Sequence, residues 1–158
     1  MGKGYSFREN YAKKNYLIYD ITHGIQADYP VVDPNVLYQK GAVVTLTNTG
    51  EVDFATGGDF PFGYVCIANI VGDTSSPNWN DHVTVCEFAM EHVYGEAAGA
   101  IPIGELVTAD GVSTTDANLM IYKVASVGEA AIGVALSAAA AAADGIVVAL
   151  LNSPVIIP

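Results

Sequence analysis

The sequence predicts an all-β protein: a compact β-sandwich or β-barrel-like body with two related halves, preceded by an extended N-terminal arm. Three observations support this fold class. Short apolar or alternating segments recur along the chain between turn-forming residues, no long segment has the 3.6-residue period of an amphipathic helix, and three short sequence matches recur in the same order. The 158 residues are 51% hydrophobic and 15% charged, which is typical of one folded body.

Eight segments have the length and composition of β-strands, and dipeptides such as Ser-Pro, Asp-Gly and Gly-Gly separate them. They are expected at residues 42–47, 52–55, 64–71, 83–88, 101–108, 119–125, 132–136 and 146–151.

Residues 1–38 differ in character from this body. Seven aromatic residues lie among polar ones, and Pro30 and Pro34 stiffen the second half of the segment. We therefore expect residues 1–38 to form the extended arm and residues 39–158 to form the β-body.

An internal duplication is expected within the body. Val44-Thr45 matches Val107-Thr108, and "DHVTV" at 81–85 matches "DGIVV" at 144–148, each pair 63 positions apart. Between these matches, "GYVCIA" from residue 63 corresponds to "GVALSA" from residue 133, 70 positions later. The matches predict related halves at 39–94 and 95–158.

Six consecutive alanines occupy residues 138–143. A membrane-spanning helix is excluded here, because Gly133, Ser137, Asp144 and Gly145 interrupt the apolar run. The local sequence leaves helix and loop open, since alanine favours helix. The aligned segment of the first half, "NIVGDTSSPNWN", has loop composition. The alanines are therefore expected to form a compact loop or one short helical turn between two strands.

The net charge of −11 is distributed unevenly. Residues 1–14 hold four cations and one acid, whereas the rest of the chain holds two cations and sixteen acids. An acidic body repels phosphate, so we expect no direct nucleic-acid partner and no membrane partner. The basic arm suits an acidic protein surface. No secretory signal opens the chain, which predicts synthesis in a cytoplasm.

The sequence shows no catalytic constellation. Cys66 and Cys86 lack metal-binding spacing and are expected to be buried free thiols. His82 and Cys86 are four residues apart on one expected strand, roughly 13 Å and too far for a nucleophile and its base. The glycine-rich stretches lack phosphate-loop and dinucleotide patterns. No catalytic residue, cofactor or metal is expected, and Trp79 is a candidate loop contact.

Several stretches resemble one known family. They are "GAIPIGELVTADG" and "AAIGVALSAAAAAADGIVVALL" in the second half, with "KGAVVTLTNTGEV" and "PFGYVCIANIV" as the matching first half. Together they resemble the capsid decoration, or cement, proteins of tailed bacteriophages, over roughly residues 39–151. The long loop at 71–82 and the 38-residue arm are not part of that pattern.

The resemblance implies a structural, non-enzymatic protein on the exterior of the virion capsid. Such a protein binds the major capsid protein of an assembled shell as a homotrimer and stabilises the shell. The role of the arm is inferred separately: aromatic and basic side chains would anchor it to a partner. These candidate contact residues are Lys3, Tyr5, Phe7, Arg8, Tyr11, Lys13, Lys14 and Tyr16.

Two other classes stay open from the residues. A receptor- or glycan-binding module of the head-fibre type would use Trp79 and the tyrosines as a recognition patch, and would bind cell-surface sugar rather than capsids. A small hydrolase would use Cys86 or His92, and full function of a Cys86→Ala variant would exclude a Cys86 enzyme.

Overall fold

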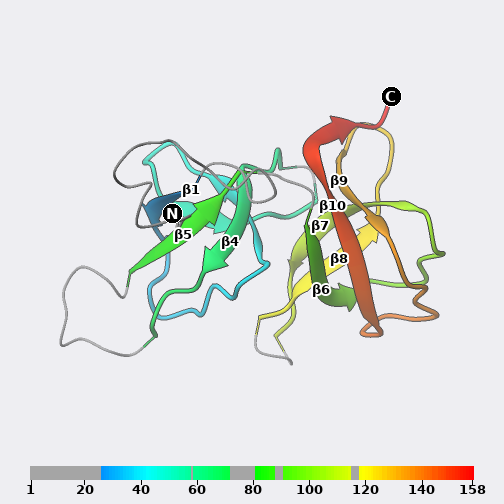
Figure 1. Ribbon diagram of the computed structural model, residues 1–158, viewed down its shortest axis with the longest axis horizontal. Helices are drawn as coiled ribbons and strands as arrows, with labels where there is room; N and C mark the ends of the chain where they lie inside the picture. Colours follow the sequence, from blue (N-terminus) through cyan, green and yellow to red (C-terminus); the bar gives the residue numbers. More distant parts are fainter. Residues whose placement is uncertain (1–25, 58, 72–80, 88–90, 115–117) are drawn as a thin grey trace, which may run out of the picture.

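The computed structural model describes residues 26–57, 59–71, 81–87, 91–114 and 118–158. All regular structure in these residues is β, in ten strands that form two five-stranded bodies side by side (Figure 1). The all-β class and the two-part body expected from the sequence are confirmed. We call the body of strands β1–β5 the N-terminal half and that of β6–β10 the C-terminal half.

The N-terminal half is a sheet in the order β1-β5-β4-β2-β3, in which all neighbouring strands are antiparallel. Its two outermost strands approach each other, because Val31, directly after β1, makes a parallel bridge to Val52 of β3. The strands are β1 (Gln26–Pro30), β2 (Val43–Leu46), β3 (Val52–Phe54), β4 (Gly63–Ile67) and β5 (His82–Cys86).

The C-terminal half is a closed barrel in the order β10-β6-β8-β7-β9. The parallel pairing of β6 with β8 closes it, and the other pairs are antiparallel. Alternate residues point inward, which leaves a core of small and branched apolar side chains. The strands are β6 (His92–Ala97), β7 (Leu106–Val112), β8 (Met120–Val124), β9 (Ala130–Ala135) and β10 (Gly145–Ile156).

The two halves share one topology. When the barrel is read starting from β6, its strand order is β6-β10-β9-β7-β8. This is the order of the N-terminal sheet, β1-β5-β4-β2-β3, with five added to each strand number. The registers also correspond at the 63- and 70-residue offsets found in the sequence: Val43↔Tyr64 matches Leu106↔Val134, and Tyr64↔Cys86 matches Val134↔Ala149. β1 and β6 correspond at an offset of 66 residues, so that Val31↔Val52 matches Ala97↔Tyr122.

Loop hydrogen bonds repeat in the same way. Gly41 N donates to Val65 O at 2.7 Å, and Gly104 N donates to Ala135 O at 2.8 Å, again 63 and 70 positions later. Both glycines have positive φ, +92° and +90°, a conformation that other residues adopt at a cost. The equivalence of the halves therefore extends from strand order to individual turns.

The arm boundary predicted between residues 38 and 39 is corrected. β1 pairs with β5 over five residues, and Tyr38 is buried in the core. The N-terminal half thus begins by Gln26, and the repeated unit begins at β1 and again at β6 (residue 92) instead of at 39 and 95. Residues 1–25 lie outside the described residues.

Strand boundaries differ from the prediction at several places. β1 and β6 were not expected, residues 101–105 are a loop before β7, and β7 continues through Asp110-Gly111. β4 ends at Ile67 rather than at residue 71, because the side chain of Asn69 bonds the loop backbone, donating to Val36 O and accepting from Tyr38 N. β10 extends to Ile156 through a bulge.

Pro30 gives a physical reason why only the C-terminal half has a continuous closing ladder. By the register, Pro30 occupies the place of Glu96, which pairs with Ile121 across the β6–β8 closure. Proline has no backbone N–H to donate, so a ladder cannot continue through it. The equivalent closure in the N-terminal half is reduced to the Val31–Val52 bridge and the bond from Val32 N to Val52 O at 3.1 Å.

The alanine run is a loop between β9 and β10, as expected from the alignment of the halves. The carboxylate of Asp144 accepts hydrogen bonds from Ala140 N and Ala141 N, at 2.8 and 2.9 Å, which folds the loop back on itself. Ala139 bridges to Ile101 and fastens the loop to the barrel. Asp144 therefore replaces helical hydrogen bonds at this point.

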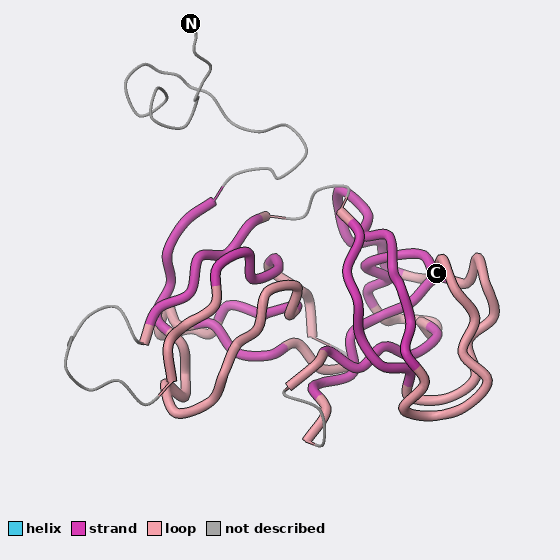
Figure 2. The backbone as a smooth tube through the Cα atoms, turned by 60° about the horizontal axis from the view of Figure 1, so that its bottom comes forward, coloured by secondary structure: helices cyan, strands magenta, loops and turns pink. Residues whose placement is uncertain are grey.

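The seam between the halves is made by backbone and side-chain contacts. Gly111 N donates to Ala55 O at 3.1 Å, and the amide of Asn118 donates to Leu37 O at 3.0 Å. Gly57 lies against the ammonium of Lys123, where a Cβ would come within 2.7 Å of it. Figure 2 shows the strands of the two halves as two bodies on either side of this seam.

Candidate functional site: a groove at the seam

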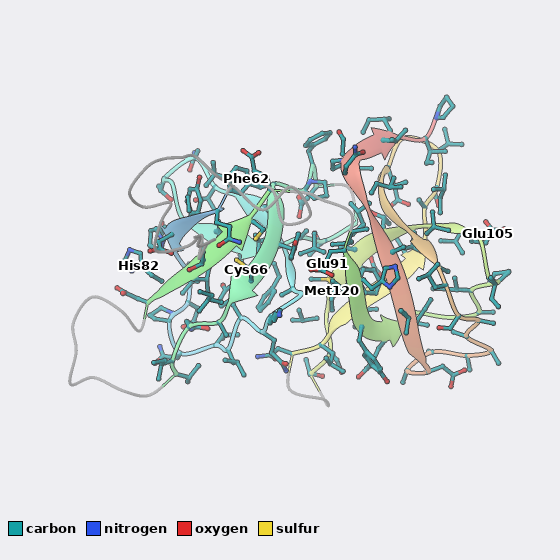
Figure 3. The ribbon with its side chains drawn as sticks, viewed as in Figure 1. Phe62, Cys66, His82, Glu91, Glu105 and Met120 are labelled. Carbon is teal, nitrogen blue, oxygen red and sulfur yellow. The ribbon has the colours of Figure 1, made fainter. Side chains whose placement is uncertain are left out.

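An open groove of about 390 Å³ crosses the seam between the two halves. The N-terminal half contributes the end of β2, the loop before β4 and the residue after β5, and the C-terminal half contributes the bulge of β10. Figure 3 shows Phe62 on the upper side of the N-terminal half, the side on which β10 ends. The lining residues are Thr45, Leu46, Phe60, Pro61, Phe62, Glu87, Asn152, Ser153 and Pro154.

The groove continues into an exposed apolar surface. Phe60 is 63% exposed, and Leu46 beside it is also exposed. Beyond Pro154, Val155 and Ile156 are also exposed on the last residues of β10. We call the two exposed apolar residues that line the groove, Leu46 and Phe60, the groove rim. Exposed apolar side chains that gather at one depression are typical of a surface that binds another macromolecule.

Local bonds hold the groove in shape. Phe62 packs edge-on against Tyr29 of β1, with ring centroids 5.1 Å apart. Phe62 N donates to Val44 O at 2.7 Å, and the hydroxyl of Thr45 donates to Phe60 O at 3.3 Å. The loop that carries Phe60 is thereby anchored to β2, so the exposed ring projects from a fixed backbone.

A second cleft, of about 370 Å³, lies lower on the seam. Polar and aromatic side chains line it, including Lys40, Glu91, His92 and Tyr94 around the ring of Tyr64. Burial raises the pKa of Tyr64, and the neighbouring Cys86 and Glu91 raise it further, so this phenol stays protonated over the physiological range. The cleft thus offers hydrogen-bonding groups beside aromatic rings.

The two cysteines lie on neighbouring strands. Cys86 is fully buried, whereas Cys66 is partly exposed and donates to Thr84 O at 3.3 Å. A hydrogen bond with the Cys86 side chain lowers the pKa of the Cys66 thiol. Both are free thiols; Cys86 is buried as expected, whereas Cys66 is only partly so.

The histidines named in the sequence are far apart along the fold. His82 begins β5 and bonds with its neighbour Asp81 at 3.0 Å, whereas His92 begins β6 and is exposed. Cys86 ends β5, so neither histidine is its cross-strand partner. The described residues contain no group of three or more His, Cys, Asp or Glu side chains that could hold a metal ion.

The candidate contact residues predicted from the sequence lie outside the described residues. This applies to the arm residues up to Tyr16 and to Trp79. The groove was not predicted, because its lining comes from residues 45–46, 60–62, 87 and 152–154, which only the fold brings together.

No protein-family model matches this chain, and no curated protein matches it either. Within the described residues there is no helix with the length and apolar character needed to cross a membrane.

Proposed function

We propose that this protein is a capsid decoration, or cement, protein, which binds the major capsid protein on the outside of an assembled shell and stabilises it. The observation that carries the proposal is the groove rim: two exposed apolar side chains, Leu46 and Phe60, at a depression that spans both halves of the β-body. The sequence resemblance described above supports the same function.

The groove suits attachment to a large protein surface. A partner edge seated in it would bury Phe60 and Leu46 and remove apolar area from water, at about 25 cal/mol per Å². Glu87 lines the groove, and the body carries a large excess of acids, so the complementary shell surface is apolar with a basic margin. Burial would supply most of the affinity, and charge would set orientation and association rate.

The arm adds a second attachment. Its four cations and its aromatic residues within 1–16 suit an acidic groove on the shell or on a neighbouring subunit of the proposed homotrimer. An arm that orders on binding adds contact area at an entropic cost. Many copies on one lattice then gain from multivalency.

The test compares particles with and without the protein. At a free concentration a hundredfold above Kd, binding to the intact lattice alone stabilises each site by about 2.7 kcal/mol. Particles that lack the protein should therefore release their genome at a lower temperature at matched ionic strength. Identical release temperatures would contradict the cement function.

Variants connect that test to the groove. Phe60→Glu should lower occupancy on shells by roughly tenfold or more, because it places a charge in the apolar rim. Ile67→Glu is the matched control, since Ile67 is equally exposed on the N-terminal half but does not line the groove. Deletion of residues 1–16 should weaken attachment while the β-body stays folded. Equal loss from both Glu variants would reject the groove as the attachment site.

The second cleft favours an alternative, a receptor- or glycan-binding module. Tyr94 is exposed beside Glu91 and His92, a combination of aromatic surface and hydrogen-bonding groups that suits a polar ligand. This alternative predicts saturable binding to cell-surface glycans that Tyr94→Ala removes. Glycan binding without any affinity for shells would move the assignment to this class.

A further inference from the structure

The duplication allows each surface of one half to be compared with its counterpart in the other. On the N-terminal half, we define the covered face as Gln39, Gly41, Val43 and Tyr64. The register makes these residues equivalent to Pro102, Gly104, Leu106 and Val134 of the C-terminal half. We call these four equivalents, together with the exposed residues Ile103 and Leu136, the open face.

The two faces differ in exposure. Val43 and Tyr64 are 0% and 1% exposed, whereas Leu106, the equivalent of Val43, is 37% exposed and Val134, the equivalent of Tyr64, is half-buried. Ile103 and Leu136 of the open face are 67% and 44% exposed. Each residue of the covered face is therefore less exposed than its equivalent in the open face.

The covered face is buried against the C-terminal half. A Cβ on Gly41 would lie 3.6 Å from the side chain of Val93, and Tyr64 interacts with Glu91. The same cleft is lined by Tyr64 from one half and by the start of β6 from the other. Figure 3 shows Glu91 between the two halves. The start of β6 is thus the surface that covers this face within one chain.

The open face lies on the far side of the molecule. Glu105, between Gly104 and Leu106, lies in Figure 3 on the side of the C-terminal half that is remote from the N-terminal half. Within the described residues, no counterpart of β6 covers it. By the duplication, the counterpart of the start of β6 is β1, and its residues Gln26, Ala27 and Asp28 are exposed.

We infer that the open face binds the β1 surface of a second copy of this chain, in a contact that repeats the one already made between the two halves. One copy would supply Ile103, Leu106 and Leu136, and the next would supply Gln26 and Asp28. Such a contact is head-to-tail, because the two surfaces are different. It leaves one free surface at each end until a ring of copies closes. This inference concerns self-association and does not depend on binding to a shell.

The experiment measures the mass of the purified full chain in solution across a range of concentrations, by light scattering after size separation. The wild type should form a species larger than the 16.5 kDa monomer. Ile103→Glu and Leu136→Glu each place a charge on the open face, and should raise the dissociation constant roughly tenfold or more. Both positions are exposed, so the fold should tolerate the change, and thermal unfolding would check this.

Two further variants make the test specific. Gln26→Glu alters the other side of the contact with a near-isosteric change, and should weaken assembly as well, since Glu105 adjoins the open face. Val127→Glu is the control, because Val127 is exposed on the same half but is not part of the open face. The Val127→Glu protein should keep the wild-type mass.

Three outcomes would overturn the inference. A wild type that is monomeric at every concentration would show that no second copy occupies the open face. Assembly that Ile103→Glu leaves unchanged would place the contact elsewhere. Assembly that the open-face variants break but Gln26→Glu leaves intact would indicate that two open faces pair with each other, against the head-to-tail arrangement.

Discussion

The two halves of this molecule reach the same topology with different interiors. In the N-terminal half, Tyr38 stacks on Phe54 with ring centroids 4.1 Å apart, and its hydroxyl donates to Asp53 at 3.2 Å. In the C-terminal half, Ile101 takes the place of Tyr38, and the buried tyrosine is Tyr122, at the position of Val52. The two halves therefore keep the same strand order and register although their largest core side chains differ.

The features that do not vary between the halves are those that the backbone requires. Gly63 and Gly133 occupy equivalent places on β4 and β9. A Cβ on Gly63 would lie 2.3 Å from Cys86 O, and one on Gly133 would lie 2.4 Å from the Val148 side chain and 2.8 Å from Ala149 O. At these points the neighbouring strand leaves no space for any side chain.

The largest expected effect on stability comes from placing a side chain at these two glycines. Gly63→Ala should destabilise the protein by about 3 kcal/mol and Gly133→Ala by somewhat less, because the first clash is with a carbonyl and the closest one in the second is with a methyl group that can shift. Urea unfolding measures both. Gly99→Ala is the control, since nothing lies within 4 Å of its Cβ position and its φ is ordinary. A tolerated Gly63→Ala would refute the equivalence drawn between these glycines.

The match between "GYVCIA" from residue 63 and "GVALSA" from residue 133 is visible in the sequence, and the strand register confirms that Gly63 and Gly133 are equivalent. β6 was not predicted because its inward residues, Val93, Gly95 and Ala97, are small and the strand contains a glycine. Gly95 is needed there, since a Cβ would meet Met120 O and the ring of Tyr122. Close packing between strands that are distant in sequence leaves no local apolar signal.

β1 was assigned to the arm for a related reason. Its residues QADYP are largely polar and end in proline, and it is a strand only because β5 supplies a partner. Surfaces are harder still to predict. The groove and the open face depend on which outward residues a neighbouring half happens to cover, and Val43 and Leu106 are both ordinary apolar strand residues in the sequence.

The next effect concerns two of the buried tyrosines, Tyr38 and Tyr122. Among the described residues, the hydroxyl of Tyr122 has no hydrogen-bond partner, whereas that of Tyr38 bonds to Asp53. Burial raises the pKa of both phenols, so both are neutral at physiological pH. Tyr38→Phe should cost about 1 kcal/mol, and Tyr122→Phe should be neutral or stabilising by about 1 kcal/mol. Thermal unfolding of the two variants at pH 7 compares them directly, and equal losses would show that Tyr122 has an unseen partner.

A smaller gain is expected in the alanine loop, which belongs to the C-terminal half. Ala143 has φ of +69°, in the left-handed region that favours glycine. Ala143→Gly should relieve that strain, although glycine makes the unfolded chain more flexible and so lowers part of the gain. The net stabilisation should be about 0.5 kcal/mol. Ala141→Gly in the same loop is the control and should lose stability, because Ala141 is not among the residues with positive φ. Differential scanning calorimetry resolves a shift of this size.

The smallest effect should come from the ion pairs at the seam, which lie against Gly57 of the N-terminal half. Lys123 Nζ lies 2.8 Å from Glu129 and 3.6 Å from Asp110. Hydrogen bonding to Lys123 lowers the pKa of Glu129, and the bond to Glu129 raises the pKa of Lys123. Because folding lowers the pKa of Glu129, its carboxylate stabilises the fold above the unfolded pKa of 4.5, and this stabilisation is lost as the pH falls through the lower pKa of the folded state. Because folding raises the pKa of Lys123, its ammonium stabilises the fold below the unfolded pKa of 10.5, and this stabilisation is lost as the pH rises through the higher pKa of the folded state.

Glu129→Gln should therefore reduce stability only slightly at pH 7, because the pair is partly open to solvent and screened by salt. The difference between wild type and variant should be constant from pH 6 to 9 and should shrink below the carboxyl pKa, where wild-type Glu129 becomes neutral as well. Urea midpoints measured from acid pH, below the carboxyl pKa, up to pH 9 at low and moderate salt test this. A difference that persists unchanged below the carboxyl pKa would mean that Glu129 stabilises the seam through packing rather than through its charge on Lys123.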